Sequence, residues 1–266
     1  MTASPLPRPP LRRPRRRWLA AALLGLAVLT TTACKNGTQT EQNSSSTSSS
    51  SSSSSTTTND GSQVAQNSYT ISDPVGQLRL DGRAGAVSVV AADGPISVTE
   101  KLRWTDSKPT TSHNVAGNTL TLTDSGCAEQ RSVNGRCEVA WEIRAPAGTN
   151  LDLNSKAGGV NLTGTAGTVV AKTSAGGVEA KDLTSKSVTA QSRAGGVELA
   201  FAQPPDLIDA STNAGGVEIE VPTGTGYAVD ADSNTGHPEI DVQRDNASPH
   251  KIKAKTNAGS IEITNG

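Results

Sequence analysis

The stretch Ser192-Arg193-Ala194-Gly195-Gly196-Val197-Glu198-Leu199 decides the fold, because copies of it recur five more times in the last 116 residues. Each copy has a valine, or its replacement, at one fixed position after the glycines. Successive copies place this position 18, 19, 20, 21 and 23 residues apart, at Val160, Val178, Val197, Val217, Pro238 and Ile261. A period near twenty residues, with strand-like sequence on both sides of a fixed glycine, is typical of a solenoid in which each repeat forms one coil.

The first glycine of the pair is present in all six copies, whereas the second is not. The first-glycine positions are Gly158, Gly176, Gly195, Gly215, Gly236 and Gly259. The second position changes to His237 in the degenerate fifth copy and to Ser260 in the sixth. Only glycine adopts a positive φ without strain, so we expect a positive φ, or the closest backbone approach, at the first glycine.

Apolar residues alternate with mostly polar residues in the segment before each glycine pair. Nine residues before the valine position the residue is always aliphatic, and the six are Leu151, Val169, Val188, Ile208, Val229 and Ile252. Leucine or alanine follows two positions later, and serine or threonine two positions after that. Such alternation predicts half-buried strands, and the hydroxyl column can form hydrogen bonds between coils. The sequence therefore predicts an all-β fold, a β-solenoid with six regular coils.

The chain divides by composition into three parts. Residues 1–33 have the basic and then apolar sequence of an export signal, with an apolar run from Leu19 to Leu29 that is short for a bilayer span. Residues 34–66 are dominated by serine and threonine, and we expect a disordered tether. Residues 67–266 form the predicted solenoid, with an irregular or capping half at 67–150 and regular repeats at 151–266. Two separate domains are the alternative. Arg83 to Val89 is an early, weaker copy of the repeat.

The segment Thr31-Thr32-Ala33-Cys34 resembles a bacterial lipoprotein signal, although Thr31 stands where leucine is typical. The resemblance implies cleavage before Cys34, a diacylglyceryl group on its sulfur and attachment to the membrane through this lipid. Ordinary secretion with a stray cysteine is the alternative. Arg15-Arg16-Arg17-Trp18-Leu19 fits a twin-arginine pattern loosely, so both export routes stay open.

Charge and cysteines limit the partners and cofactors. Six of the 24 basic residues lie in the signal, so the mature chain has 18 basic against 25 acidic residues, which argues against nucleic acid. Outside the cytoplasm we expect a disulfide between Cys127 and Cys137, around the turn sequence Asn134-Gly135. A metal site there would lack CxxC spacing and a nearby histidine. The sequence predicts no metal site and no cofactor.

Signals for catalysis are missing from the sequence. The histidines His113, His237 and His250 are isolated in polar surroundings, and no nucleophile motif is present. Three aspartates share an outward column, but no aromatic platform for a sugar accompanies them; they are Asp152, Asp209 and Asp230. Trp104 and Trp141 lie in strand-like runs and are expected in the core. We therefore predict that the protein is not an enzyme.

One acidic column follows the valine position directly. It contains Asn161, Glu179, Glu198, Glu218, Glu239 and Glu262. Since the residues on either side face the core, the glutamates should face outward along one flank, with neighbouring carboxylates about 5 Å apart. Two interpretations stay open: a solvated, charged face, or a weak stripe for a divalent cation or a cationic ligand.

The repeats also resemble a known family. Pro146-Ala147-Gly148-Thr149-Asn150, leading into Leu151 and followed by serial Ala-Gly-Gly-Val-Glu units, is similar to a bacterial β-strand-repeat family of unknown function described as putative adhesins. The similarity is strong over 146–266 and loose from about 67. It implies a right-handed β-solenoid at the cell surface, with no catalytic residues to carry over. We expect a surface lipoprotein with a binding module for an unknown protein or glycan. The alternative is an envelope scaffold or regulatory lipoprotein for a membrane partner.

Overall fold

The computed structural model describes residues 54–58, 60–129, 131 and 135–266. These residues form twenty strands in two sheets and no helix, so the predicted all-β solenoid is confirmed. The part of the chain that is described accordingly has no helix long and apolar enough to cross a bilayer. The export signal, Cys34 and most of the predicted tether lie outside the described residues.

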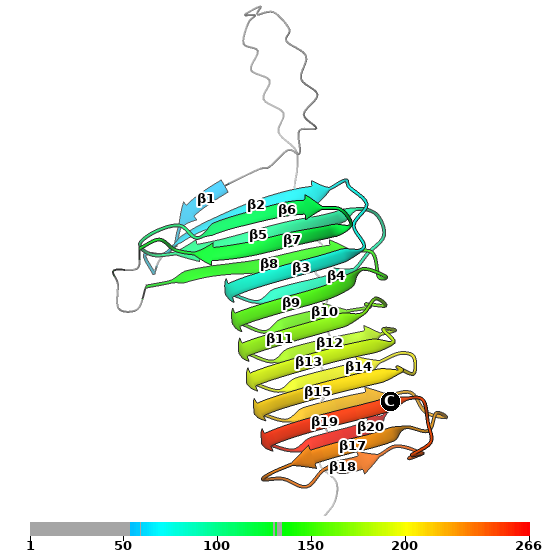
Figure 1. The fold of residues 1–266 in the computed structure, drawn as a ribbon. Helices are drawn as coiled ribbons and strands as arrows, with labels where there is room; N and C mark the ends of the chain where they lie inside the picture. Colours follow the sequence, from blue (N-terminus) through cyan, green and yellow to red (C-terminus); the bar gives the residue numbers. More distant parts are fainter. Residues whose placement is uncertain (1–53, 59, 130, 132–134) are drawn as a thin grey trace, which may run out of the picture. The chain divides into compact units, whose positions relative to one another are not determined.

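Each regular repeat contributes one strand to each sheet, and the strands of successive coils lie parallel and in register (Figure 1). The register pairs the predicted columns with each other, for example Val178 with Val197 and Ala171 with Ala190. The strands of the nine-stranded sheet in this region are β9 (Asn150–Ala157), β11 (Val169–Ala175), β13 (Ser187–Ala194), β15 (Leu207–Ala214), β17 (Ala228–Ser233) and β19 (Lys251–Ala258). Those of the eleven-stranded sheet are β10 (Val160–Thr163), β12 (Val178–Leu183), β14 (Val197–Phe201), β16 (Val217–Val221), β18 (Glu239–Asp241) and β20 (Ile261–Asn265).

Two more coils of the same kind precede the regular repeats. Strands β3 (Gln77–Ala84) and β4 (Val87–Ala91) form the first, and Val87 pairs with Val160, as expected of an early copy. Strands β7 (Thr119–Gly126) and β8 (Cys137–Ala145) form the second. Antiparallel strands complete this end of the stack: β1 (Ser54–Thr57), β2 (Gln63–Ile71), β5 (Ile96–Trp104) and β6 (Thr110–Ala116).

The order of the coils in space departs from chain order near both ends of the stack. The coil β3/β4 lies between β7/β8 and β9/β10. At the other end the C-terminal coil β19/β20 lies between β15/β16 and β17/β18 (Figure 1). The degenerate fifth repeat is therefore the last coil in space, although it is not the last in sequence.

The direction of the backbone hydrogen bonds explains why the degenerate repeat lies at the end. At the valine position each N–H donates to a carbonyl of the next coil, as from Val197 to Gly216 at 2.9 Å and from Val217 to Ser260 at 2.9 Å. In the last coil this position is Pro238, which has no N–H to donate. A proline here removes one donor from the exposed edge and so weakens the template for a further strand.

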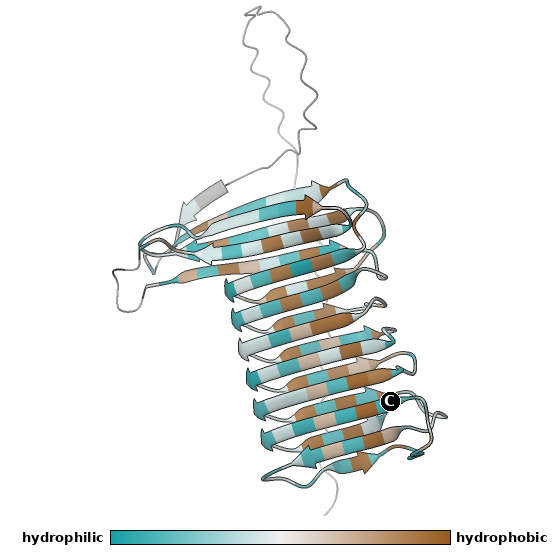
Figure 2. Cartoon of the chain, in the orientation of Figure 1, coloured by the Kyte–Doolittle hydropathy of each residue, from teal (hydrophilic) through white to brown (hydrophobic). Residues whose placement is uncertain are grey.

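The core lies between the two sheets and is built mainly from alanine, valine, leucine and isoleucine. Hydrophobic residues alternate with hydrophilic ones along the strands (Figure 2). Trp104 and Trp141 are 6% and 1% exposed, so their predicted place in the core is confirmed.

The predicted boundary of the tether differs from the structure at its C-terminal side. Residues 54–57 and 63–66 pair as β1 and the start of β2. Asp60 stabilises the turn between them, because it accepts a hydrogen bond from Ser62 Oγ at 2.7 Å and forms an ion pair with Arg103. Hydrogen bonds from Ser62 and Thr58, with the charge of Arg103, hold the pKa of the Asp60 carboxyl well below its ordinary value. Backbone pairing and this turn order a segment whose composition alone predicts a coil.

Candidate binding site on the flanks of the stack

The glycine turns form one sharp corner of every regular coil. The φ angle is 130° at Gly176, 141° at Gly195 and 143° at Gly215, and it is also positive at Gly158 and Gly259. A Cβ on Gly195 would lie 2.5 Å from the carbonyl carbon of Gly176, so the coils can stack only with glycine here.

Gly236 departs from this pattern, since its φ is not positive. It is followed by His237 and Pro238 in the terminal coil, and the proline restricts His237 to extended conformations. The expected close backbone approach is nevertheless present at Gly236, where a Cβ would lie 2.5 Å from the Gly259 carbonyl oxygen.

Four members of the serine and threonine column hold the corner of one coil against its neighbour. The hydroxyl of Ser192 donates to the Gly176 carbonyl at 2.9 Å, and that of Thr212 to the Gly195 carbonyl at 2.7 Å. Thr256 and Ser233 make the equivalent bonds near the C-terminal end of the stack. These bonds fix the two flanks relative to each other, so that outward side chains project from a rigid surface.

The predicted glutamate column forms a row on the outer face of the eleven-stranded sheet, which we call the acidic flank. In space the row runs Glu179, Glu198, Glu218, Glu262, Glu239, because the C-terminal coil is inserted. Glu179 forms an ion pair with Lys181 at 2.5 Å, which raises the pKa of the lysine. Nowhere in the described ranges do three or more His, Cys, Asp or Glu side chains form a group that could hold a metal ion.

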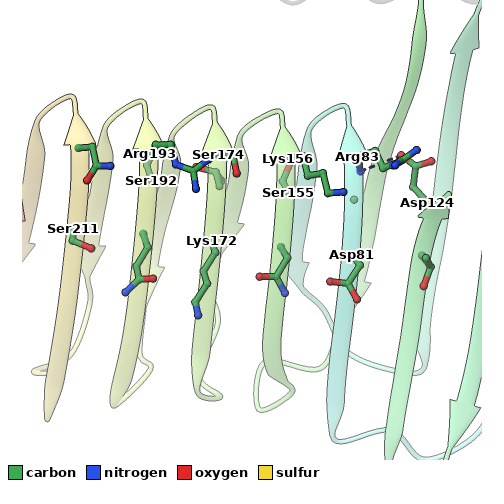
Figure 3. A pocket seen from close by; sticks show the side chains of 16 residues that line it. Asp81, Arg83, Asp124, Ser155, Lys156, Lys172, Ser174, Ser192, Arg193 and Ser211 are labelled. Carbon is green, nitrogen blue, oxygen red and sulfur yellow. Dashed lines mark hydrogen bonds between the residues drawn. The ribbon is translucent and has the colours of Figure 1, made fainter. Parts of the chain in front are cut away.

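The outer face of the nine-stranded sheet carries a hollow of about 650 Å³, which we call the basic hollow (Figure 3). Four exposed cations line it: Arg83 on β3, Lys156 on β9, Lys172 on β11 and Arg193 on β13. Figure 3 shows Lys156 and Arg193 beside the turns and Lys172 farther along its strand. The sequence analysis did not identify this group, because its members belong to two different columns of the repeat.

A buried polar cluster lies at the end of the stack formed by β2, β5 and β6. The Glu100 side chain is 3% exposed and accepts hydrogen bonds from Tyr69 at 2.8 Å, Thr111 at 2.7 Å and Asn67 at 3.2 Å. The Tyr69 ring stacks on His113 with centroids 4.3 Å apart. Burial, and then the charge of Glu100, hold the pKa of the Tyr69 phenol well above its ordinary value. The alternation of β5 carried the signal for this cluster, since Glu100 falls on its inward face.

The remaining predicted site residues have separate locations. Cys127 and Cys137 form the predicted disulfide, with Cα atoms 6.0 Å apart, at the connection between β7 and β8. Cys34 lies outside the described residues. His250 is not simply solvated, because its Nδ1 is 2.7 Å from the Pro205 carbonyl oxygen and its ring meets that of Tyr227 edge to face.

Two of the three aspartates in the outward column make ion pairs. Asp152 lies 3.9 Å from Arg79, and Asp209 lies 3.9 Å from Lys253. This column therefore does not bring together the free carboxyl pair that an acid–base mechanism would require.

Two solved structures are distantly similar to this chain. A putative cell adhesion protein of Clostridium sporogenes is 13% identical, with 76% of this chain and 99% of that chain covered and a TM-score of 0.43. A putative adhesin of Bacteroides fragilis is 18% identical, with 76% and 97% covered and a TM-score of 0.45. No curated protein matches the sequence significantly. The family model described as Toastrack DUF4097 matches residues 33–265, almost the whole chain. The protein therefore belongs to the Toastrack DUF4097 family.

Proposed function

We propose that this protein is a surface lipoprotein whose β-solenoid is a binding module of the adhesin kind, held at the membrane by a lipid on Cys34. The observation that carries the proposal is the pair of exposed, rigid flanks with different charge. On the outer faces of β9 to β20, the nine-stranded sheet carries six basic and four acidic residues. The eleven-stranded sheet carries one basic and eight acidic residues over the same coils. Regular flat faces with fixed charge favour recognition of an extended ligand.

The position of β1 supports a tethered arrangement. β1 is the edge strand of the eleven-stranded sheet at one end of the stack, and β17 and β18 lie at the opposite end (Figure 1). The chain from Cys34 to Ser54 can span at most about 70 Å. A lipid at Cys34 would therefore hold the β1 end nearest to the membrane and leave both flanks accessible.

The anchor is tested by mass spectrometry of the membrane fraction of cells that express the full chain. We expect an acylated mature N-terminus at Cys34 and release of a Cys34→Ser variant from the membrane. An intact Met1 terminus, or a Cys34→Ser variant retained as well as the parent, would contradict the anchor.

The binding role is tested by incubating the released chain with bacterial and host cells, matrix and immobilised glycans. We expect saturable binding that a Cys34→Ser variant retains, because the flanks and not the lipid would carry it. If none of these surfaces binds and one membrane protein co-purifies instead, the scaffold role replaces the adhesin role.

A further inference from the structure

Three of the four cations of the basic hollow have no partner within the described part of the chain, whereas Arg83 donates a hydrogen bond to the Ser125 carbonyl at 2.9 Å. Lys156, Lys172 and Arg193 make no ion pair and no hydrogen bond to another described residue. The two carboxylates that line the same hollow are engaged elsewhere. Asp81 lies 3.7 Å from Arg79, and Asp124 accepts hydrogen bonds from the backbone N–H groups of Arg83 and Gly126.

Two of the three lysines that β19 carries on the same sheet face are paired with carboxylates. Lys253 lies 3.9 Å from Asp209, and Lys255 lies 3.8 Å from Asp232. Among the described residues of β9 to β19, Lys251 is the one other unpaired cation on this face. Three of the four unpaired cations of these strands therefore lie at the hollow.

The strand register places the three unpaired cations at the corners of a triangle. Lys172 lies between Asn154 and Gln191 on the neighbouring strands. Ala175 on β11 pairs with Ala157 on one side and with Ala194 on the other. Lys156 and Arg193 each precede one of these alanines, so they lie on the two strands that flank β11. With strands about 4.8 Å apart and alternate residues about 6.6 Å apart along a strand, each edge of the triangle is about 8–10 Å. Flexible lysine and arginine side chains can converge from these corners on one or two anionic groups.

The floor and rim between the cations are polar and contain no aromatic ring. Asn154, Gln191, Asn213, Ser174 and Ser211 present amide and hydroxyl groups to the hollow. These groups suit a ligand rich in hydroxyls. The residues that line the hollow provide no aromatic ring on which the bases of a single-stranded nucleic acid could stack. Its charged groups favour an anionic ligand over a neutral sugar.

We propose that the basic hollow binds an acidic oligosaccharide, a chain of sugars that carry carboxylates, through Lys156, Lys172 and Arg193. This inference rests on the proposed binding function and names its ligand class. The cations would pair with the sugar carboxylates, and the amide and hydroxyl side chains would bond to the ring hydroxyls. The rigid glycine corner behind the hollow would hold the three strands at fixed spacing.

The test is calorimetry of the full-length chain with a hexamer of galacturonic acid, and with neutral maltohexaose and inorganic polyphosphate for comparison. We expect binding of the galacturonate that weakens as salt is raised, and no binding of maltohexaose. The double variant Lys172→Gln, Arg193→Gln should lose at least tenfold in affinity. The matched control Lys253→Gln, Lys255→Gln, with the same charge change on the same face, should lose less than twofold. Melting curves of both variants check that each is folded, and Lys156→Gln alone provides an independent variant.

Several results would overturn the inference. No heat with the galacturonate at millimolar concentration, equal losses in the two double variants, or equal binding of maltohexaose would each do so. Binding of polyphosphate without the galacturonate would replace the sugar by a phosphate polymer. If the chain still binds cells or matrix in any of these cases, only the ligand class is wrong. If it binds neither, the proposed function falls as well.

Discussion

The repeating middle of the stack and its two ends differ in what their sequences must achieve. In the coils from β9 to β16, the same small residues recur because each coil must lie against the backbone of the next, as Gly195 does against Gly176. The ends must stop that stacking, and there the sequence departs from the repeat. The buried tryptophans, the Glu100 cluster and the disulfide lie at one end, and Tyr227, His250 and Pro238 lie at the other. The residues of the middle are determined by what fits between two coils. The residues of the ends are determined by the need to prevent a further coil from stacking.

The largest expected effect is at the glycine corner of the middle. Gly195→Val places a side chain at a φ of 141° and 2.5 Å from the Gly176 carbonyl carbon, so it should cost about 2–5 kcal/mol of unfolding free energy. Gly196→Ser should stay within about 0.5 kcal/mol, because its φ is not positive and its Cβ would lie 3.4 Å from the nearest atom. Denaturant unfolding measures both, and equal midpoints would contradict the assignment of the strained position.

At the end of the stack the largest effect should come from Glu100. Glu100→Ala removes the acceptor for Tyr69, Thr111 and Asn67 and should cost about 2–3 kcal/mol. The control is Glu142→Ala on the neighbouring strand, an exposed residue paired with Lys101, which should cost at most about 1 kcal/mol. Similar losses in the two variants would mean that the polar cluster does not stabilise this end.

The difference between middle and ends also explains what the sequence could predict. Equivalent positions of the repeats, such as Val178 and Val197, predicted the coils, the register and the outward glutamates. They could do so because every middle repeat must stack on the backbone of its neighbours. The coil order could not be read from the period, since β17/β18 and β19/β20 both fit the next place on β15/β16. Pro238 is the feature that could have indicated the terminal coil, because it has no N–H at a position where the other repeats donate a hydrogen bond to the next coil.

The candidate site was less accessible to sequence reasoning. The basic hollow arises from register between three repeats, in which Lys172 and the pair Lys156 and Arg193 occupy different columns. The inward position of Glu100 follows from the alternation of β5. Its donors, however, come from β2, the neighbouring strand of the same sheet, and from β6 in the other sheet. Such contacts depend on the irregular end of the fold, where no period constrains the sequence.

An alkaline titration compares the two ends through their tyrosines. The chain has two tyrosines, Tyr69 and Tyr227, and burial raises the pKa of both. A raised pKa means that the folded state binds the proton more tightly, so this stabilisation is complete below pH 10 and is lost as the pH rises toward the folded pKa. Phenolate absorbance should therefore appear only with unfolding, whereas the chain in guanidinium should titrate near pH 10. Ionisation of either tyrosine near pH 10 in the folded chain would contradict its burial.

A smaller effect is expected for one hydroxyl of the middle. Thr212→Val keeps the shape of the side chain but removes the hydrogen bond to the Gly195 carbonyl, and should cost about 1 kcal/mol. Thr189→Val on the outward face of β13 is the control and should cost less than half as much. A neutral Thr212→Val variant would show that backbone stacking alone holds the corner.

The smallest effect should be a gain in stability from the acidic flank. Glu198 and Glu218 lie in register on adjacent strands, where like charges oppose each other by a few tenths of a kcal/mol to about 1 kcal/mol. The double variant Glu198→Gln, Glu218→Gln should therefore melt higher than the parent at low salt, and the difference should vanish in concentrated salt. Glu179→Gln should bring no gain, because Lys181 already balances that charge. If millimolar calcium instead raises the melting midpoint of the parent and fails to do so in the double variant, the row binds a cation and its repulsion is offset by that ligand.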